Sequence, residues 1–443
     1  MNHSKRAVIS WEDCYKPFRV NFPREARMSK GCVVGSVNMK EYRIPVEQNV
    51  RIEQQVWHNL KDAQLLPKNN SLNKQTIWDD LSVEIHNTYK EKKLKKISDL
   101  ELNWNGWLSP FSGYGIANLG WMVALDDLTG GGVTVGWERR KPDNSPEWKA
   151  FTDKQKEIML RPFKEAPIGI TKTTPPLWKE GKGRFKIGYS MTESDVLGKT
   201  WADIANGMDA LFVPCEFCKE AYLKGGVGKP IYVVTQGFNE WQYPYLERPK
   251  RDVFTFGTCG YLDSRKNYQQ LVQAFKSEFD KDEPVRLVMK NSNPNFGYED
   301  FDDERIKIVN RMFDPDEMAY LYYMFDCFVF PSKGEGSGLP PREAMATGCP
   351  AIVPDYSGTA EIADEEYVYV LHPTGREKDR RGEASQPGEW ATYDVEELMY
   401  LMRQAYENED IKKMGKRASN WMHKEFTWEK GARKMIKILE KIV

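Results

Sequence analysis

The sequence predicts an α/β protein with two doubly wound, Rossmann-like domains that face a cleft, preceded by an N-terminal extension. Two series of short apolar segments alternate with segments of helical apolar spacing, one before and one after a polar, proline-bearing stretch at residues 238–252. Such alternation is typical of parallel sheets covered by helices, and such a stretch is typical of a linker. The chain of 443 residues is long enough for two domains and an extension.

Residues 1–98 show no such alternation, and we interpret them as an extension of unknown role. Helical-looking pieces cover residues 46–65 and 77–94, and the aromatic and branched residues argue against disorder. Residues 1–100 carry 18 Lys and Arg against 12 Asp and Glu, including the basic run from Lys90 to Lys96. This excess favours an anionic partner such as a nucleic acid; a solvated charged surface is the alternative.

The first series, residues 99–240, predicts one Rossmann-like domain, and residues 241–252 form the core of the linker. Its expected strands are residues 102–108, 132–137, 167–171, 185–191, 210–214 and 231–234, and its expected helices are residues 116–128, 200–208 and 216–224. Ligands of such sheets bind beyond the carboxyl ends of the strands. The glycine turn at Gly113 and the segment carrying Thr192 and Glu193 follow expected strands, so they are candidates for the site.

The second series, residues 253–425, predicts the other domain. Its expected strands are residues 254–260, 285–290, 306–310, 327–330, 351–353 and 367–371, and its expected helices are residues 267–279, 315–325 and 342–347. Residues 375–390 are interpreted as a charged, glycine-bearing loop. Helices are expected over residues 395–406, 411–424 and 428–442, and we expect the last segment, residues 426–443, to cross back to the first domain.

A glycine-rich loop between two expected strands carries the strongest chemical signal. It runs from Gly334 to Gly338 and leads into a helix that opens with two prolines, where free backbone N–H groups and the helix dipole favour an anion. Glu335 and Glu343 flank the loop with seven residues between them. A carboxylate accepts two hydrogen bonds from a diol, so the arrangement suits a nucleoside diphosphate with a hydroxyl-bearing group. The structural alternative for either carboxylate is to complement the helix dipole.

The segment FVFPSKGEGSGLPPREAMATGCPAIVPDYSGTAEI resembles the nucleotide-sugar signature of family-4 retaining glycosyltransferases with the GT-B fold. Glu335 and Glu343 match its E-x7-E pair, and Gly358 and Glu361 match its later glycine and acid. The segment GYLDSRKNYQQLVQAF resembles the part of that family with a phosphate-binding lysine, here Lys266. Residues 187–217, followed by GVGKPIYVVTQGF, resemble the end of its N-terminal domain, so the resemblance covers roughly Asn103 to Val443.

The resemblance implies a role for each matching residue. Glu343 would bind the ribose, Glu335 the donor sugar, and Lys266 the diphosphate leaving group. The backbone N–H groups of the loop would hold the phosphates, and the turn before the first helix would let the backbone approach the donor. The residues concerned are Gly336, Ser337, Gly338 and Leu339 in the loop and Gly113 in the turn.

The chain departs from that family at two places. The family often has an arginine where Gly260 stands, and Arg265 or Lys290 are our candidates for the second cation. The family also often has a histidine in the N-terminal domain, whereas no histidine lies between Asn103 and Phe238. Thr192 and Glu193 are our candidates for a polar group near the transferred sugar, with a helix cap as the alternative.

The acidic pairs and the cysteine pair of the sequence do not predict a metal site. We interpret Asp126 with Asp127, and Asp302 with Asp303, as solvated charges, and Cys215 with Cys218 as structural residues because no second pair follows at zinc-ligand spacing. The seven cysteines are odd in number and irregularly spaced, which favours reduced thiols and a cytoplasmic location. No apolar run reaches the ~18 residues of a membrane helix, and we expect no signal peptide.

The sequence therefore predicts a retaining, metal-independent glycosyltransferase, hexosyl- or pentosyl-transferring, that uses a UDP- or GDP-sugar and no permanently bound cofactor. The expected acceptor is a hydroxyl of a glycan, a lipid-linked molecule or a small molecule. Three alternatives stay open: transfer to a hydroxylated base in DNA or another nucleic acid, a catalytically silent nucleotide-sugar-binding or scaffold protein, and a phosphorylase or epimerase of the same fold.

Overall fold

The computed structural model describes the backbone of residues 27–29, 32–37 and 40–45, and the structure of residues 95–137, 142–293, 301–310, 313–379 and 387–443. The chain divides into two compact units, Met1–Thr88 and Tyr89–Val443. In the first unit, β1 (Arg27–Ser29), β2 (Cys32–Val37) and β3 (Lys40–Pro45) form an antiparallel sheet in that order. The helices expected over residues 46–65 and 77–94 lie outside the described residues.

The first series of strands forms a parallel sheet, six-stranded within the described residues, in the order β5-β4-β6-β7-β8-β9. Its strands are β4 (Leu102–Asn105), β5 (Val133–Val135), β6 (Ile168–Lys172), β7 (Phe185–Tyr189), β8 (Ala210–Val213) and β9 (Ile231–Val233). Its connections carry α4 (Gly113–Thr129), α5 (Pro146–Ala150), α6 (Asp153–Leu160), η1 (Pro175–Glu180), α7 (Lys199–Ala205) and α8 (Glu216–Lys224).

The second series forms another parallel sheet, also six-stranded in the described part of the chain, in the order β12-β11-β10-β13-β14-β15. Its strands are β10 (Phe254–Gly260), β11 (Val285–Asn291), β12 (Ile306–Asn310), β13 (Cys327–Val329), β14 (Ala351–Pro354) and β15 (Tyr369–Leu371). The helices are α9 (Tyr268–Glu278), α10 (Pro315–Tyr323), α11 (Leu339–Ala346), η2 (Ser357–Ile362), α12 (Val395–Glu407), α13 (Ile411–Glu425) and α14 (Trp428–Ile442). The predicted fold class, two doubly wound sheets, is confirmed.

The charged segment expected to be a loop at residues 375–390 contains strand structure, so that prediction was wrong. β16 (Pro373–Lys378) pairs antiparallel with β17 (Glu389–Tyr393). Trp390 and Tyr393 of β17 are buried, and the Tyr393 hydroxyl donates to the carbonyl of Ser332 at 2.8 Å. The charges of β16 and its glycine are typical of a loop, and no residue of β16 is buried, so its strand structure was missed.

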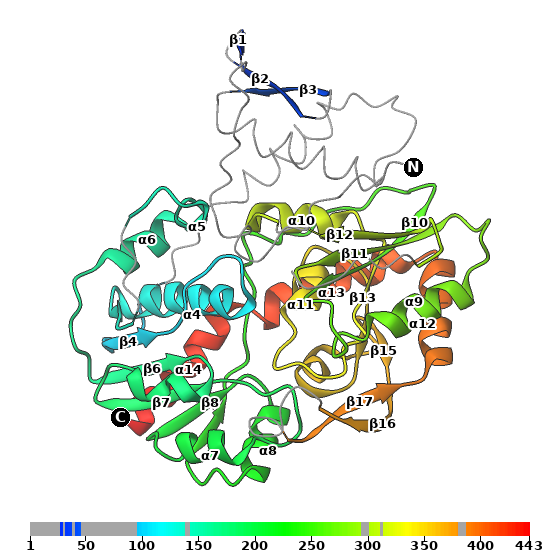
Figure 1. Ribbon diagram of the computed structural model, residues 1–443. Coiled ribbons are helices and arrows are strands. Elements are labelled where there is room, and N and C mark those ends of the chain that lie inside the picture. Colours follow the sequence, from blue (N-terminus) through cyan, green and yellow to red (C-terminus); the bar gives the residue numbers. More distant parts are fainter. Residues whose placement is uncertain are drawn as a thin grey trace, which may run out of the picture. The chain divides into compact units, whose positions relative to one another are not determined.

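The last helix, α14, packs against α4 of the first sheet although it follows the helices of the second (Figure 1). Trp428 at its start meets Trp121 of α4 edge to face, with ring centroids 5.1 Å apart. Gly120 makes room for this contact, because a Cβ there would lie 2.2 Å from Trp428 Cε2. Met435, Ile436 and Leu439 of α14 join the same core.

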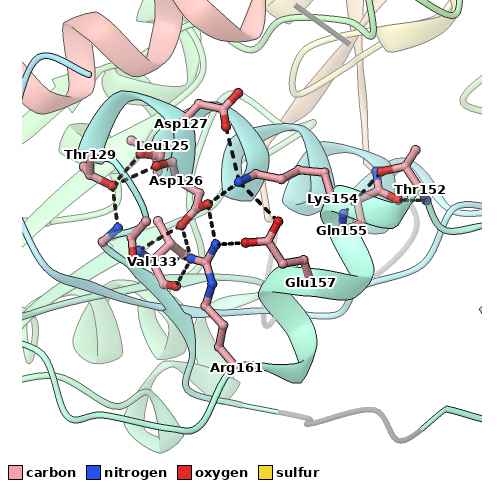
Figure 2. A network of polar contacts seen from close by, with 12 residues as sticks. Leu125, Asp126, Asp127, Thr129, Val133, Thr152, Lys154, Gln155, Glu157 and Arg161 are labelled. Atoms are coloured by element: carbon pink, nitrogen blue, oxygen red, sulfur yellow. Dashed lines mark hydrogen bonds and ion pairs between the residues drawn. The ribbon is translucent and has the colours of Figure 1, made fainter. Parts of the chain in front are cut away.

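Asp126 was expected to be solvated, but its side chain is fully buried at the centre of a polar network (Figure 2). It accepts hydrogen bonds from both terminal nitrogens of Arg161, and Lys154 Nζ lies 2.8 Å from its Oδ2. Asp303 is likewise buried and paired, with Arg305 Nη2 2.8 Å from its Oδ2. For Asp126 the sequence does not show the cations, because Lys154 and Arg161 come from a later segment. For Asp303 the cation lies only two residues away, and that local signal was missed.

Candidate functional site

The glycine loop ends at a helix start that has no side-chain cap. Gly338, the N-cap of α11, has a left-handed backbone (φ 72°), and a Cβ there would lie 2.8 Å from Thr359 Cγ2. No described side chain caps α11, and of its first three residues only Leu339 carries an N–H, because Pro340 and Pro341 follow it directly. Ser337 Oγ is buried without a hydrogen-bond partner among the described residues. This helix start therefore offers donors to an anion.

Glu335, on the same loop, is the centre of a buried cluster of charges. Its Oε1 accepts from Arg265 Nη1 at 2.6 Å, from Lys266 Nζ at 2.5 Å and from Ser332 Oγ at 2.5 Å. Burial alone would raise the pKa of Glu335, but Arg265 and Lys266 outweigh it and hold that pKa well below its ordinary value. Glu335 is therefore ionised at neutral pH.

The two cations of this cluster differ in their electrostatic surroundings. Burial lowers the pKa of Lys266, and the neighbouring guanidinium of Arg265 adds to this effect against the attraction of Glu335. For Arg265, burial is outweighed by Glu193 and Glu335, so its pKa is raised. An additional negative charge nearby would therefore stabilise the charged form of Lys266.

Glu193 joins the cluster from the first half of the chain. Its Oε1 lies 3.2 Å from Arg265 Nη2, so Arg265 bridges Glu193 and Glu335. The backbone is equally close, because a Cβ on Gly334 would lie 2.2 Å from the Glu193 carbonyl oxygen. The structure therefore brings together Glu193, Arg265, Lys266 and Glu335. Thr192 is instead fully buried in a turn, where its hydroxyl donates to the Ser194 carbonyl at 2.9 Å.

Glu343 lies on α11 and has different neighbours. Its Oε2 accepts from the Tyr322 hydroxyl at 2.8 Å. Burial raises the pKa of Glu343 to about 7, although hydrogen bonds from Tyr322 and Tyr243 and the charge of Lys290 oppose the rise. The carboxylate is therefore balanced between its two protonation states near neutral pH.

The remaining expected site residues surround these groups. Lys290, one residue before the end of β11, is buried and its charge acts on Glu343, and its Nζ lies 5.9 Å from the Phe313 ring centroid. Gly260 has a positive φ of 148°, and a Cβ there would lie 3.4 Å from Lys266 Cε. At Gly113, the first residue of α4, a Cβ would meet no atom within 4 Å. Packing thus does not require glycine at position 113, and the space in front of the turn is open.

The sequence reasoning missed Arg342, which supports the glycine loop from inside. Its guanidinium is buried, donates to the carbonyl oxygens of Ser337 (3.2 Å) and Gly358 (3.3 Å), and stacks on Phe426 with 4.7 Å to the ring centroid. An arginine among small residues just after the loop was the available signal. No group of His, Cys, Asp or Glu in the described part of the chain could hold a metal ion, and no described helix could cross a membrane.

Residues 253–379 match a family model described as glycosyl transferases group 1. A curated relative, the O-antigen chain mannosyltransferase B of Escherichia coli, is 30% identical over 118 residues, which cover 24% of this chain and 30% of the relative. The chain thus spans less than a third of that relative's length.

Two solved structures of Anabaena Alr3699/HepE, one with UDP and glucose and one with UDP-glucose, each have a TM-score of 0.55. They are 13% and 12% identical to this chain, and each match covers 77% of this chain and all of that one. At this identity the likeness concerns the fold, and it agrees with the GT-B fold that the sequence predicted.

Proposed function

We propose that this chain, a GT-B glycosyltransferase by fold and by its group 1 domain, transfers a sugar from a UDP- or GDP-sugar to a hydroxyl acceptor, with retention and without a metal ion. The observation that carries the proposal is the position of the buried Glu335 cluster on the same loop that leads to the uncapped start of α11. Donors for phosphates, cations for a leaving diphosphate and a carboxylate for sugar hydroxyls lie within one segment and its contacts.

Each part of the nucleotide sugar would have a binding partner among these residues. The amides of Gly336, Gly338 and Leu339, with the Ser337 hydroxyl, would bind the phosphates. Lys290 lies beside Glu343, so it would lie on the nucleoside side of the site. Glu343 would accept both hydroxyls of the ribose. The Anabaena structures hold UDP, glucose and UDP-glucose, which supports a nucleotide sugar as the donor.

The proposed reaction is a front-face substitution. The bond between the sugar's anomeric carbon and the diphosphate oxygen breaks, the acceptor hydroxyl attacks the same face, and its proton passes to the leaving phosphate oxygen. Lys266 and Arg265 would stabilise the negative charge that develops on the diphosphate, since fixed cations act most strongly where charge appears in the transition state. Glu335 would hold the sugar hydroxyls, and Glu193 would contact the sugar and orient Arg265.

A panel of UDP- and GDP-sugars, screened by thermal shift and by release of the nucleotide, tests the donor. Once the donor is found, Lys266→Ala or Glu335→Ala should lower turnover by about 100-fold or more, as removal of a preorganised charge partner does. Lys281→Ala, on an exposed lysine of the same half, is the matched control and should keep full turnover.

Near wild-type turnover of either site variant would show that the site is assigned wrongly. If no nucleotide sugar binds in calorimetry, the chain is a silent scaffold rather than an enzyme. A requirement for free phosphate would instead indicate a phosphorylase. Nucleic acid as the acceptor rests mainly on residues 1–94, whose side chains lie outside the described residues.

A further inference from the structure

Lys172 is a buried lysine whose amine has no partner. It ends β6, is fully buried, and its Nζ makes no hydrogen bond in the part of the chain that the structure describes. A lysine amine has three donors when charged and no means of accepting. Burying such a group without a hydrogen-bond partner lowers the stability of the fold. Packing alone therefore does not explain why a lysine stands at this position.

Two aromatic rings surround the amine. Nζ lies 4.9 Å from the ring centroid of Tyr114 and 5.4 Å from that of Tyr189. Tyr114 comes from the turn at the start of α4, and Tyr189 is the register partner of Lys172 on β7. The titratable groups around these rings are Glu193, Cys218 and Tyr222 near Tyr114, and Cys215 and Cys218 near Tyr189. Only burial shifts the pKa of Lys172, downward to about 7, so none of these groups supplies it with a counter-charge.

The position of Lys172 connects it to the proposed site. Its strand, β6, ends at the edge of the sheet where Gly113 follows the neighbouring strand β4. The ring of Tyr114 contacts the Lys172 amine, and the Glu193 carboxylate of the charge cluster contributes to raising the pKa of Tyr114. The side chain of Asn118 joins two segments at this edge, because its Nδ2 donates to the carbonyl oxygens of Lys172 (3.2 Å) and Trp107 (2.8 Å). Asn118 thus fixes the backbone of Lys172 at this edge. Tyr114, whose ring contacts the amine, directly follows Gly113, where a Cβ would meet no atom within 4 Å.

Next to this edge lies a tryptophan pair. Trp107 follows β4 and is 51% exposed, and it stacks on Trp137 after β5 with ring centroids 6.5 Å apart and 21° between the planes. An exposed aromatic face in this place can pack against the apolar face of a sugar ring. This edge of the sheet therefore carries an exposed tryptophan, which can pack on a sugar ring, and the Lys172 amine, which has no anionic partner among the described residues.

We propose that Lys172 binds a negatively charged group, a carboxylate or a phosphate, on the acceptor of the proposed sugar transfer. A neutral hydroxyl would give the buried ammonium a hydrogen bond but no compensating charge. An anion gives both, and charge-assisted hydrogen bonds are about twice as strong as neutral ones. The inference rests on the proposed function and adds the chemical class of the acceptor.

The first experiment uses the donor that the panel identifies and compares three acceptors that differ only at carbon 6: p-nitrophenyl glucoside, p-nitrophenyl glucuronide and p-nitrophenyl glucoside 6-phosphate. Wild type should use one anionic acceptor with a kcat/KM about tenfold or more above that of the neutral one. The two anionic acceptors distinguish a carboxylate from a phosphate. Lys172→Met should remove the preference, whereas Lys179→Met, on an exposed lysine nearby, should keep it.

Donor hydrolysis without acceptor separates this inference from the proposed function. It should be present in wild type and equal in Lys179→Met, because water replaces the acceptor. If hydrolysis is present but wild type treats all three acceptors alike, or Lys172→Met keeps the preference, the role of Lys172 is refuted alone. If no nucleotide sugar is hydrolysed or transferred, the proposed function fails and this inference fails with it.

Calorimetry gives a readout that is independent of turnover. At pH 8 the free amine is mostly neutral, so binding of the preferred anionic acceptor should draw a proton from the buffer. Titrations in two buffers of different ionisation enthalpy should show this uptake in wild type and not in Lys172→Met. Equal uptake in the two proteins would contradict the proposal.

Discussion

The protonation of one carboxylate, Glu343, should control donor binding near neutral pH. Its pKa is raised to about 7 by burial, and only the ionised form accepts two hydrogen bonds from a ribose diol. Because the ionised fraction rises from about a tenth at pH 6 to about nine tenths at pH 8, we expect the KM for the donor to fall close to tenfold over this range. Steady-state kinetics at fixed ionic strength measures this change in the KM for the donor.

One variant identifies the group responsible. Glu343→Gln should flatten the KM profile, since the amide does not titrate. Glu335 should contribute nothing to the profile, because its pKa lies well below this range. A wild-type KM that does not change between pH 6 and pH 8 would show that Glu343 does not bind the ribose as a carboxylate.

The buried amine of Lys172 should lower the free energy of unfolding relative to a protein with an apolar side chain at this position. Its pKa of about 7 lies below the ordinary 10.5, so the unfolded chain binds more protons and stability rises with pH between these two values. At about 1.4 kcal/mol per pKa unit, the cost at pH 7 is on the order of 4 kcal/mol. Lys172→Met should therefore raise the free energy of unfolding in urea at pH 7, and the gain should shrink as the pH approaches 10.5.

This stability test distinguishes a functional lysine from a structural one. A lysine retained for binding should be replaceable by methionine with a gain in stability, as at many functional sites. If Lys172→Met is less stable than wild type across the whole pH range, the amine has a structural role that its contacts do not show.

At the scale of single residues, the sequence identified the groups that lie close together in the chain. Glu335, Glu343 and the loop glycines share one segment, so their spacing indicated a common site. The sequence left Arg265 and Lys290 as alternatives for a second cation, and the structure places Arg265 on Glu335 and Lys290 on the side of Glu343. Lys172 was missed because burial without a partner has no sequence pattern. Arg342 was missed because the sequence does not show that its side chain turns back to the loop carbonyls of Ser337 and Gly358.

At the scale of elements, the Asp126 network attaches α6 to α4. Arg161, just after α6, and Lys154, within it, both reach Asp126 near the end of α4 (Figure 2). The side chain of Asp126 is fully buried, while those of Lys154 and Arg161 are about one fifth exposed, at 20% and 21%. The loss of Asp126 would leave two cations at a largely dehydrated position.

We therefore expect Asp126→Asn to lower the free energy of unfolding by about 3 kcal/mol, since breaking a buried ion pair costs more than the pair itself contributes. Glu157→Gln is the matched control, because Glu157 pairs with the same Arg161 from a side chain that is 57% exposed. Its cost should stay below about 1 kcal/mol. Urea unfolding of both variants measures the difference, and equal costs would show that burial of Asp126 is not what matters.

Most elements were predictable because their signals are local. The ranges expected for α8, β10 and β12 agree with the observed ones. α11 begins at Leu339, three residues before the expected start, because the prolines form part of its first turn. The β16–β17 ribbon was missed because its pairing depends on contacts with the glycine loop, such as the bond from Ala391 N to the Lys333 carbonyl.

At the scale of the whole Tyr89–Val443 unit, the order of strands and helices predicted two parallel sheets. The sequence analysis also expected residues 426–443 to cross back to the first domain, but it did not name α4 as the helix they pack against. The contact between α14 and α4 joins residues more than three hundred positions apart in the chain. No local pattern contains that pairing, although the amphipathic spacing of residues 428–442 indicated that the helix covers some apolar surface.

Replacing Trp428 tests how much this long-range contact contributes. Trp428 is 6% exposed, packs on Trp121, and its ring Nε1 donates to Asn239 Oδ1 at 2.9 Å. Trp428→Ala should lower the free energy of unfolding by about 3–5 kcal/mol, the usual cost of removing a buried aromatic side chain. Trp107→Ala is the control of equal chemistry, because Trp107 is 51% exposed and should cost little. Urea titrations followed by circular dichroism measure both, and a Trp428→Ala protein as stable as Trp107→Ala would show that α14 does not support the first sheet.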